Sequence, residues 1–168
     1  MGPQPMIYPM ELMGQQAPAI RGFRGDYEFL SNFYPSEISY EGIKYKTVEH
    51  AYQAAKSSKP DIRLQIAALP TPGKAKRYGQ KISPLPDGWF FSKYQIMKKL
   101  LLLKFADPVL AQQLLDTGDA LLEETNFWGD TDWGVCNGVG QNRLGFLLME
   151  VRTMIDPSNS SKKPEPAF

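Results

Sequence analysis

The segment from residue 89 to residue 105 sets the strongest limit on what this chain can fold into. It reads WFFSKYQIMKKLLLLKF and contains neither proline nor glycine. An apolar segment of this length without a helix breaker predicts the longest helix of the protein. Because apolar side chains occupy most of its circumference, we expect this helix to lie at the centre of the fold. At 168 residues, the chain is long enough to bury one core around it.

The residues before this helix predict a β-hairpin and then a short helix. SEISYEGIKYKT alternates in the manner of β-strands on both sides of Glu41-Gly42, and a two-residue loop that ends in glycine favours a hairpin. Thr47 is a suitable N-cap for the helix in TVEHAYQAAK. The apolar stripe of this helix comprises Val48, Ala51, Tyr52 and Ala55.

Prolines divide the rest of the chain into short elements. Three predicted helices have a proline in their first turn, at Pro60, Pro72 and Pro108. ALLEET is a predicted strand, and NRLGFLLMEVRTMI is a predicted closing helix. We expect a single domain over residues 18–156, with a flexible arm over residues 1–17 and a disordered tail over residues 157–168.

Composition narrows the class of protein. The formal net charge is +1, so no overall field would steer the chain to nucleic acid or to a membrane surface. The longest run of consecutive leucines, at residues 100–103, is too short to span a bilayer. The single cysteine, Cys136, excludes a disulfide within the chain and favours a reducing compartment. We therefore expect a cytoplasmic protein without membrane attachment.

A line of polar residues crosses the predicted helix in TVEHAYQAAK. Glu49, Gln53 and Lys56 follow one another at helical spacing, beside His50, the only histidine of the chain. Two interpretations fit this line: a solvated helix face, or the acid, amide and amine of an active site. Because no nucleophile motif accompanies His50, we expect this histidine to have a structural role.

A long glycine-rich segment, NFWGDTDWGVCNGVGQ, spans residues 126–141. Loops of this length are usually functional or disordered, and the two tryptophans argue against disorder. Trp128, next to Gly129 and Asp130, provides a stacking surface beside an acid, which suits a planar base and a ribose. The same sequence also fits a second interpretation, in which the tryptophan packs on the core and fixes the loop.

Signals for metal and phosphate binding are weaker. One histidine and one cysteine do not make a zinc site of the usual spacing, and Asp130 with Asp132 suits either magnesium or a turn. GVGQN before the last helix suits either an anion site or an entry loop in which Asn142 is the N-cap. We predict no metal and no cofactor. A basic cluster, which suits phosphate or a solvated helix face, comprises Lys74, Lys76, Arg77 and Lys81.

Six stretches, taken in order, carry a resemblance to a known family. They are FLSNFYPSEISYEGIKYKTVEHAYQAAK, PTPGKAKRYGQKI, GWFFSKYQIMKKLLLLKF, LLDTGDALLEET, FWGD and GQNRLGFLLMEVR, and they span about Phe29 to Arg152. These stretches resemble the NADAR/YbiA family, which are N-glycosidases acting on riboflavin-pathway intermediates and ADP-ribose compounds. The resemblance implies an α+β fold, a YbiA-like single domain that is mostly helical around a small β-sheet, with a cleft between these segments.

The resemblance also implies a catalytic pair. Glu49 matches the family acid, and Asp130 matches the aspartate of the WGD motif. Cleavage of a ribosyl C–N bond passes through an oxocarbenium-like state, which a carboxylate stabilises while an acid helps the base to leave. Lys56 is the third predicted catalytic residue, because an amine could form a Schiff base with the opened sugar.

Five further residues are predicted to bind the substrate: Asn32, Gln53, Trp89, Trp128 and Asn142. Four match family positions, namely the asparagine of SNF, the aromatic before the long helix, the tryptophan of WGD and the amide that opens the last helix. Gln53 belongs to the polar helical line. TDWGVCNGV departs from the loop that we expect after WGD, which bears on substrate choice more than on chemistry.

The sequence therefore predicts an N-glycosidase with a small nucleotide-like substrate, and an ADP-ribosylated nucleic acid is a second candidate substrate. Two alternatives stay open: a non-catalytic ADP-ribose or nucleotide-binding module, and a nucleic-acid-binding protein. Two facing carboxylates favour the enzyme, because the binding of an anion gains nothing from them. The near-neutral charge counts against nucleic acid. The sequence makes no prediction of oligomeric state.

Overall fold

The computed structural model describes residues 18–161. The predicted flexible arm, residues 1–17, lies outside the described residues, as does the end of the predicted tail, residues 162–168. Residues 157–161, the start of the predicted tail, belong to the described part of the chain. They form a short 3-10 helix, Pro157–Ser161, which packs against the last α-helix.

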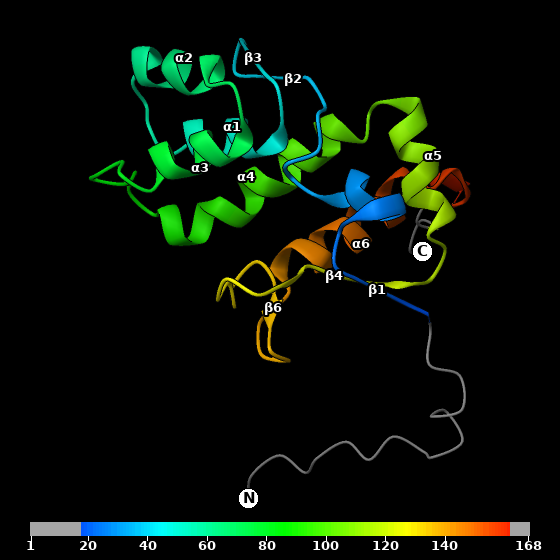
Figure 1. Ribbon diagram of the computed structural model, residues 1–168. Coiled ribbons are helices and arrows are strands. Elements are labelled where there is room, and N and C mark those ends of the chain that lie inside the picture. The colour runs from blue at the N-terminus through cyan, green and yellow to red at the C-terminus, as the bar shows by residue number, and fades with distance from the viewer. Residues whose placement is uncertain (1–17, 162–168) are drawn as a thin grey trace, which may run out of the picture.

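Six α-helices and three pairs of short strands make up the described part of the chain (Figure 1). The helices are α1 (Val48–Ala54), α2 (Pro60–Ala68), α3 (Pro72–Gly79), α4 (Trp89–Lys104), α5 (Pro108–Asp116) and α6 (Arg143–Ile155). The strands are β1 (Ala19–Arg21), β2 (Ile38–Tyr40), β3 (Ile43–Tyr45), β4 (Leu121–Glu123), β5 (Thr125–Asn126) and β6 (Val135–Cys136). The result is the predicted α+β fold, in which helices dominate.

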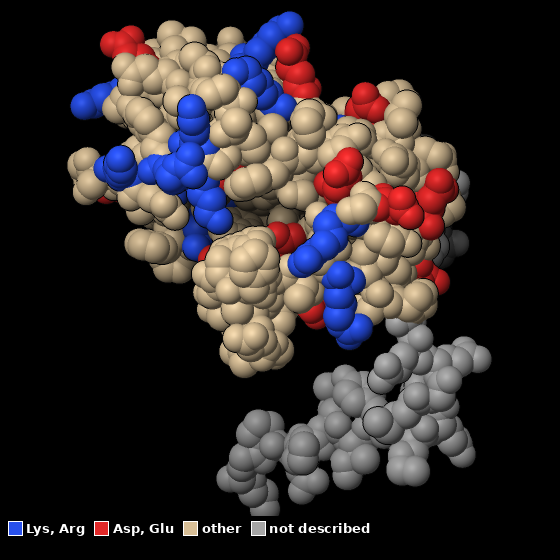
Figure 2. Space-filling view, viewed as in Figure 1, with Lys and Arg blue, Asp and Glu red and all other residues tan. Residues whose placement is uncertain are grey.

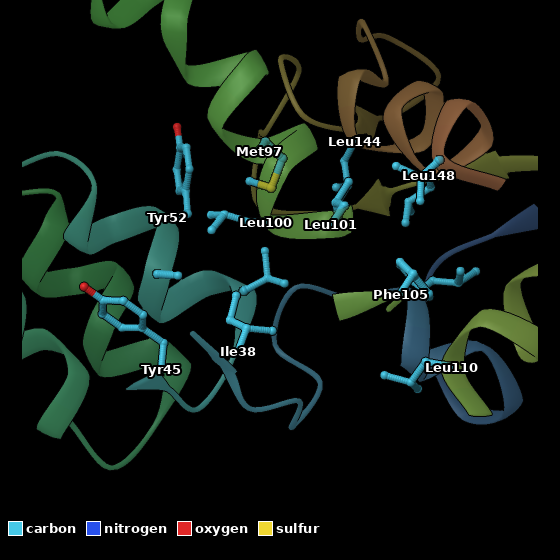
Figure 3. Packing of buried hydrophobic residues seen from close by; sticks show 14 of the residues in the cluster. Ile38, Tyr45, Tyr52, Met97, Leu100, Leu101, Phe105, Leu110, Leu144 and Leu148 are labelled. Carbon is cyan, nitrogen blue, oxygen red and sulfur yellow. The ribbon is translucent and has the colours of Figure 1, made fainter. Parts of the chain in front are cut away.

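Helix α4 occupies the centre of the fold, as the sequence predicts. It is the longest helix and packs against α1, α6 and β2. Met97, Leu100 and Leu101 are almost completely buried. Figure 3 shows them between Tyr52 of α1 and Leu144 of α6, so that α4 joins the two ends of a continuous core.

The strands form three separate two-stranded pairs. The predicted hairpin is present: β2 and β3 are antiparallel, and Glu41 and Gly42 have φ values of 47° and 82°, as a tight turn of two left-handed residues requires. Strands β1 and β4 are parallel and bring the start of the described chain beside residues 121–123. Strands β5 and β6, also parallel, close the glycine-rich loop on itself.

Helix α1 is buried along its whole length. All seven residues from Val48 to Ala54 are buried, and α2, α3 and α4 pack around them. The Thr47 side chain caps the helix by accepting the His50 N–H. Burial of a helix that carries an acid, a histidine and an amide is costly unless each polar group finds a partner or faces a cavity.

His50 has the structural role that the sequence predicts. Its Nε2 lies 3.0 Å from the carbonyl oxygen of Leu69, which can only accept, so Nε2 carries the proton. Nδ1 then accepts from the Thr47 hydroxyl, at 2.8 Å. Burial lowers the pKa of His50 and keeps the ring neutral. The ring therefore fixes the start of α1 to the residue that follows α2.

Lys104, at the end of α4, is a fully buried amine. Its Nζ donates to the carbonyl oxygen of Ser31 at 2.8 Å and lies over the rings of Tyr34 and Phe105. Burial lowers the pKa of Lys104 to about 7. The folded protein therefore binds this proton less tightly than the unfolded chain does.

Lys104→Met should remove a specific pH dependence of stability. Between about pH 7 and about pH 10 the unfolded chain holds the Lys104 proton and the folded protein does not, so stability rises with pH. Urea unfolding at several pH values should show the wild type gaining roughly 1 kcal/mol per pH unit relative to Lys104→Met. A difference that stays constant across this range would contradict the assignment.

Candidate active site

A cavity of about 570 Å³ opens between α1, α3, α4 and the glycine-rich loop. Figure 2 shows the hollow, with acidic side chains visible in it and lysine and arginine side chains around it. The acidic and basic side chains that line the cavity are Glu49, Lys56, Lys76, Glu124 and Asp130. The aromatic side chains that line it are Phe33, Tyr52, Trp128 and Trp133.

Six of the eight site residues predicted from the sequence line this cavity: Asn32, Glu49, Gln53, Lys56, Trp128 and Asp130. They come from three separated segments of the chain. Two predicted substrate-binding residues, Trp89 and Asn142, are not among the lining residues.

Glu49 and Gln53 form one hydrogen-bonded unit on α1. Gln53 Nε2 donates to Glu49 Oε1 at 2.7 Å, and both side chains are buried. Burial raises the pKa of the Glu49 carboxyl, while the Gln53 amide and the charges of Lys76 and Lys56 act in the opposite direction. The polar line on this helix is therefore a cavity wall and not a solvated face.

Lys56 follows α1 and lies over the ring of Tyr52, with Nζ 5.6 Å from the ring centroid. Burial lowers the pKa of this amine, and the charge of Glu49 opposes that shift. A lowered pKa increases the neutral fraction of a lysine, and the neutral amine is the nucleophilic form.

Asp130 both shapes its loop and faces the cavity. Its Oδ1 accepts the backbone N–H groups of Asp132 and Trp133, at 3.1 and 2.9 Å. The Asn126 side chain binds the Asp130 backbone twice, by accepting its N–H at 3.0 Å and by donating to its carbonyl oxygen at 2.7 Å. These contacts fix the loop and hold the carboxylate at the cavity.

The two loop tryptophans have different environments. Trp128 is 53% exposed, and Lys76 Nζ lies 5.5 Å from its ring centroid. Trp133 packs edge-on against Tyr52 at 5.5 Å and against Tyr94 at 5.3 Å. Trp128 therefore offers an open stacking surface, while Trp133 anchors the loop to α1 and α4.

Trp89 and Asn142 have supporting positions. Trp89 is 4% exposed, and its ring packs on Tyr52 with centroids 5.5 Å apart. Asn142 Nδ2 donates to the carbonyl oxygen of Leu122 at 2.9 Å, and its Oδ1 accepts the Glu124 N–H at 3.0 Å. Asn142 thus joins the start of α6 to β4 and does not cap the helix with its side chain.

The structure also shows where the residues of the weaker metal, anion and basic-cluster signals lie. The Asp132 carboxylate accepts hydrogen bonds from Lys93 Nζ at 2.6 Å and from the Tyr94 hydroxyl at 2.9 Å. Within residues 18–161, no cluster of three or more His, Cys, Asp or Glu side chains is arranged to hold a metal ion. The backbone N–H groups of residues 141–144 donate to carbonyl oxygens of residues 131–134, so the proposed anion site is already filled by the loop. In the basic cluster, Lys76 lines the cavity, while Lys74, Arg77 and Lys81 are exposed.

Sequence reasoning missed Glu124, Lys76, Tyr52 and Trp133. For Glu124 the sequence did contain a signal, because in an extended strand it lies on the same side as Leu122, two residues earlier. Leu122 is fully buried in the structure. The Glu124 side chain is half-buried with its Oε2 enclosed, and this burial together with the charge of Asp130 raises its pKa to about 7. Three buried side-chain oxygens in the described range lack a hydrogen-bond partner, and all belong to cavity residues: Asn32 Oδ1, Gln53 Oε1 and Glu124 Oε2.

Among the described residues, no helix is long and apolar enough to cross a membrane. The fold and the cavity define an α+β protein with a cavity lined by acids and aromatic rings.

Comparison with known proteins identifies the family. The NADAR domain model matches residues 21–156. N-glycosidase YbiA of Shigella flexneri is 39% identical over 136 residues, which cover 77% of this chain and 82% of the relative. A riboflavin biosynthesis protein of Vibrio vulnificus is 36% identical over 132 residues, 74% of this chain and 34% of the relative. The NMR structure of the E. coli protein YbiA is 34% identical, with a TM-score of 0.78 over 91% of this chain and 94% of that chain. The chain belongs to the NADAR domain family.

Gly79→Ala should destabilise the protein although alanine favours helices. A Cβ at Gly79 would lie 1.9 Å from Gln53 Oε1 and 2.7 Å from its Cδ, so the Gln53–Glu49 unit would have to move. We expect a loss of about 1–3 kcal/mol in the free energy of unfolding, measured by urea titration. Gly73→Ala on the same helix is the control, since its Cβ would meet only Arg77 Nη1 at 3.8 Å. Equal stability of the two variants would contradict the close packing of α1 on α3.

Proposed function

We propose that this protein is an N-glycosidase that cleaves the bond between a ribosyl sugar and a nitrogenous base in the cavity described above. The observation that carries this proposal is the position of Glu49, a buried carboxyl in the wall of the same cavity as the half-exposed ring of Trp128. The N-glycosidase name of relatives that are 39% identical supports the same activity. Membership in the NADAR domain family supports it as well.

Each part of the reaction has a matching group. Charge develops at the anomeric carbon as the C–N bond breaks, and a carboxylate in a cavity of low dielectric stabilises that charge strongly. Burial raises the pKa of Glu49, and the Gln53 amide, which also orients its Oε1, and the charges of Lys76 and Lys56 oppose that shift. Asp130 adds negative charge from the loop. Trp128 provides a planar surface for the base, and its stacking keeps the sugar in place.

The substrate that we propose first is a phosphoribosylamino-pyrimidine, an intermediate of riboflavin synthesis. A curated relative of this chain is named as a riboflavin biosynthesis protein, which supports that choice. An ADP-ribosyl group on guanine, free or in nucleic acid, is the second proposed substrate. Lys76 beside the ring of Trp128 suits a phosphate next to a stacked base in either compound.

Lys56 supports a covalent variant of the mechanism. In that variant the amine would attack the aldehyde carbon of the opened sugar, and loss of water would leave a Schiff base. The lowered pKa and the position of Lys56 in the cavity favour such a role. Reduction with borohydride during turnover would trap this intermediate as a stable adduct of sugar and protein, which mass spectrometry detects.

A non-catalytic nucleotide-binding module is the alternative from another class. The cavity contains three carboxyls, and these raise the cost of binding an anionic ligand without any gain in affinity. The direct test is incubation of the purified protein with each proposed substrate, with release of the free base followed by chromatography. Release of base supports the enzyme, and binding without release from either compound supports the module.

Glu49→Gln should fold normally and lose turnover. Glutamine keeps the oxygen that accepts from Gln53, so the local structure is retained while the charge is lost. We expect the single-turnover rate to fall at least about 100-fold, with ligand affinity within a few-fold of wild type. Glu37→Gln makes the same change at an exposed residue and should leave both values unchanged. Retention of more than about a tenth of the wild-type rate would exclude Glu49 as a catalytic group.

Trp128→Ala should act mainly on binding. Loss of a stacking partner costs roughly 1–3 kcal/mol, which is a loss of affinity of about 5- to 150-fold. Calorimetric titration with ADP-ribose measures it. Phe127→Ala is the matched control, because Phe127 is 82% exposed and does not line the cavity. Equal losses in the two variants would show that Trp128 has no specific contact with the ligand.

A further inference from the structure

Glu124 is a half-buried acid that the catalytic scheme above leaves unused. It stands between β4 and β5 and lines the cavity. Its Oε2 is buried and has no hydrogen-bond partner among residues 18–161. A buried carboxyl oxygen without a donor carries a cost of about 1–3 kcal/mol, which a folded protein tolerates mostly at functional sites.

The backbone on both sides of Glu124 is fixed. Its N–H donates to Asn142 Oδ1 at 3.0 Å, and its carbonyl oxygen accepts the Val135 N–H at 2.8 Å. Gly134 lies directly against it, since a Cβ there would come within 2.2 Å of the Glu124 carbonyl oxygen. Asn142 and Gly134 therefore position Glu124, which gives the predicted site residue Asn142 an indirect role.

The three carboxyls of the cavity have different hydrogen-bond partners. Asp130 Oδ1 accepts two backbone N–H groups. Glu49 Oε1 accepts from Gln53. Of the carboxyl oxygens in the cavity, Glu124 Oε2 is the one that is both buried and without a hydrogen-bond partner among the described residues. Burial disfavours the ionised form of both glutamates, and a side-chain hydrogen bond opposes this effect only at Glu49, where Gln53 is the donor.

The charges around Glu124 favour the same assignment. Burial and the negative charges of Asp130 and Glu49 raise the pKa of Glu124 to about 7, and Lys76 and Arg24 only partly oppose them. Its acid form is therefore well populated at neutral pH, which is the condition for a general acid.

We propose that Glu124 is the general acid that protonates the departing base. The proposal rests on the N-glycosidase function. The proton on the Glu124 carboxyl passes to a nitrogen of the leaving base as the electron pair of the C–N bond moves to that base. Water then adds to the anomeric carbon and gives a proton to Glu49. The products are the free base and a sugar with an anomeric hydroxyl, and proton exchange with solvent restores both carboxyls.

The test is Glu124→Gln, with Glu123→Gln as the matched control. Glu123 is the neighbouring residue, accepts from the Thr125 hydroxyl and does not line the cavity. The probes are a phosphoribosylamino-pyrimidine, whose base must be protonated to leave, and 7-methylguanosine 5′-phosphate, whose base is already cationic. For each protein, kcat/KM is measured against pH, together with the melting temperature and the affinity for ADP-ribose.

We expect Glu124→Gln to lose about 10²- to 10⁴-fold in kcat/KM on the first probe and much less on the second. In the wild type, the rate on the first probe should fall as pH rises through about 7, and Glu124→Gln should lack this decrease. Equal losses on the two probes, or a decrease with pH that persists in Glu124→Gln, would overturn the role of Glu124. A wild type that releases no base from either probe would instead overturn the N-glycosidase function.

Discussion

The complete burial of α1 is the constraint on which the rest of this structure depends. A helix enclosed by α2, α3 and α4 would normally be apolar on all sides, yet α1 carries Glu49, His50 and Gln53 in two turns. His50 meets Thr47 and the carbonyl oxygen of Leu69, so its polar atoms are satisfied. The acid and the amide are satisfied only in part by each other, and their remaining atoms require a cavity.

The cavity in turn depends on how the glycine-rich loop is held. Asp130 and Asn126 bind the backbone of their own loop, and Trp133 fixes it to Tyr52 of α1. This second wall adds two carboxyls, Glu124 and Asp130, to the one on α1. Carboxyls that are close together in a medium of low dielectric differ in protonation state, and acid–base catalysis requires such a difference. The same burial that costs stability therefore prepares the groups for chemistry.

The sequence allowed the helices and the hairpin to be predicted, because each has a local signal, and six of the eight residues predicted for the site line the cavity. Proline and threonine mark the helix starts, and Glu41-Gly42 marks the turn. The burial of α1 had no such signal, since its polar spacing fits a solvated face equally well. Only packing against α3, with Gly79 directly on Gln53, decides between the two.

The remaining site residues depend on contacts between distant segments. Trp89 and Trp128 are both tryptophans beside glycine, and sequence alone does not reveal that Trp89 packs behind Tyr52 while Trp128 remains open. Lys76 belongs to a basic cluster of four side chains, and only Lys76 lines the cavity. Which of the four does so depends on how the helix is oriented in the fold. Asn142 was identified as a position of interest, but its partners on β4 lie about twenty residues away in sequence.

The most direct test of this account is a crystal structure of Glu49→Gln with an intact phosphoribosylamino-pyrimidine bound. The account predicts that the anomeric carbon lies within reach of residue 49 and that the base nitrogen contacts the Glu124 carboxyl. It also predicts that the ring of the base stacks on Trp128. A ligand bound outside the cavity, or one whose C–N bond lies away from both acids, would contradict it.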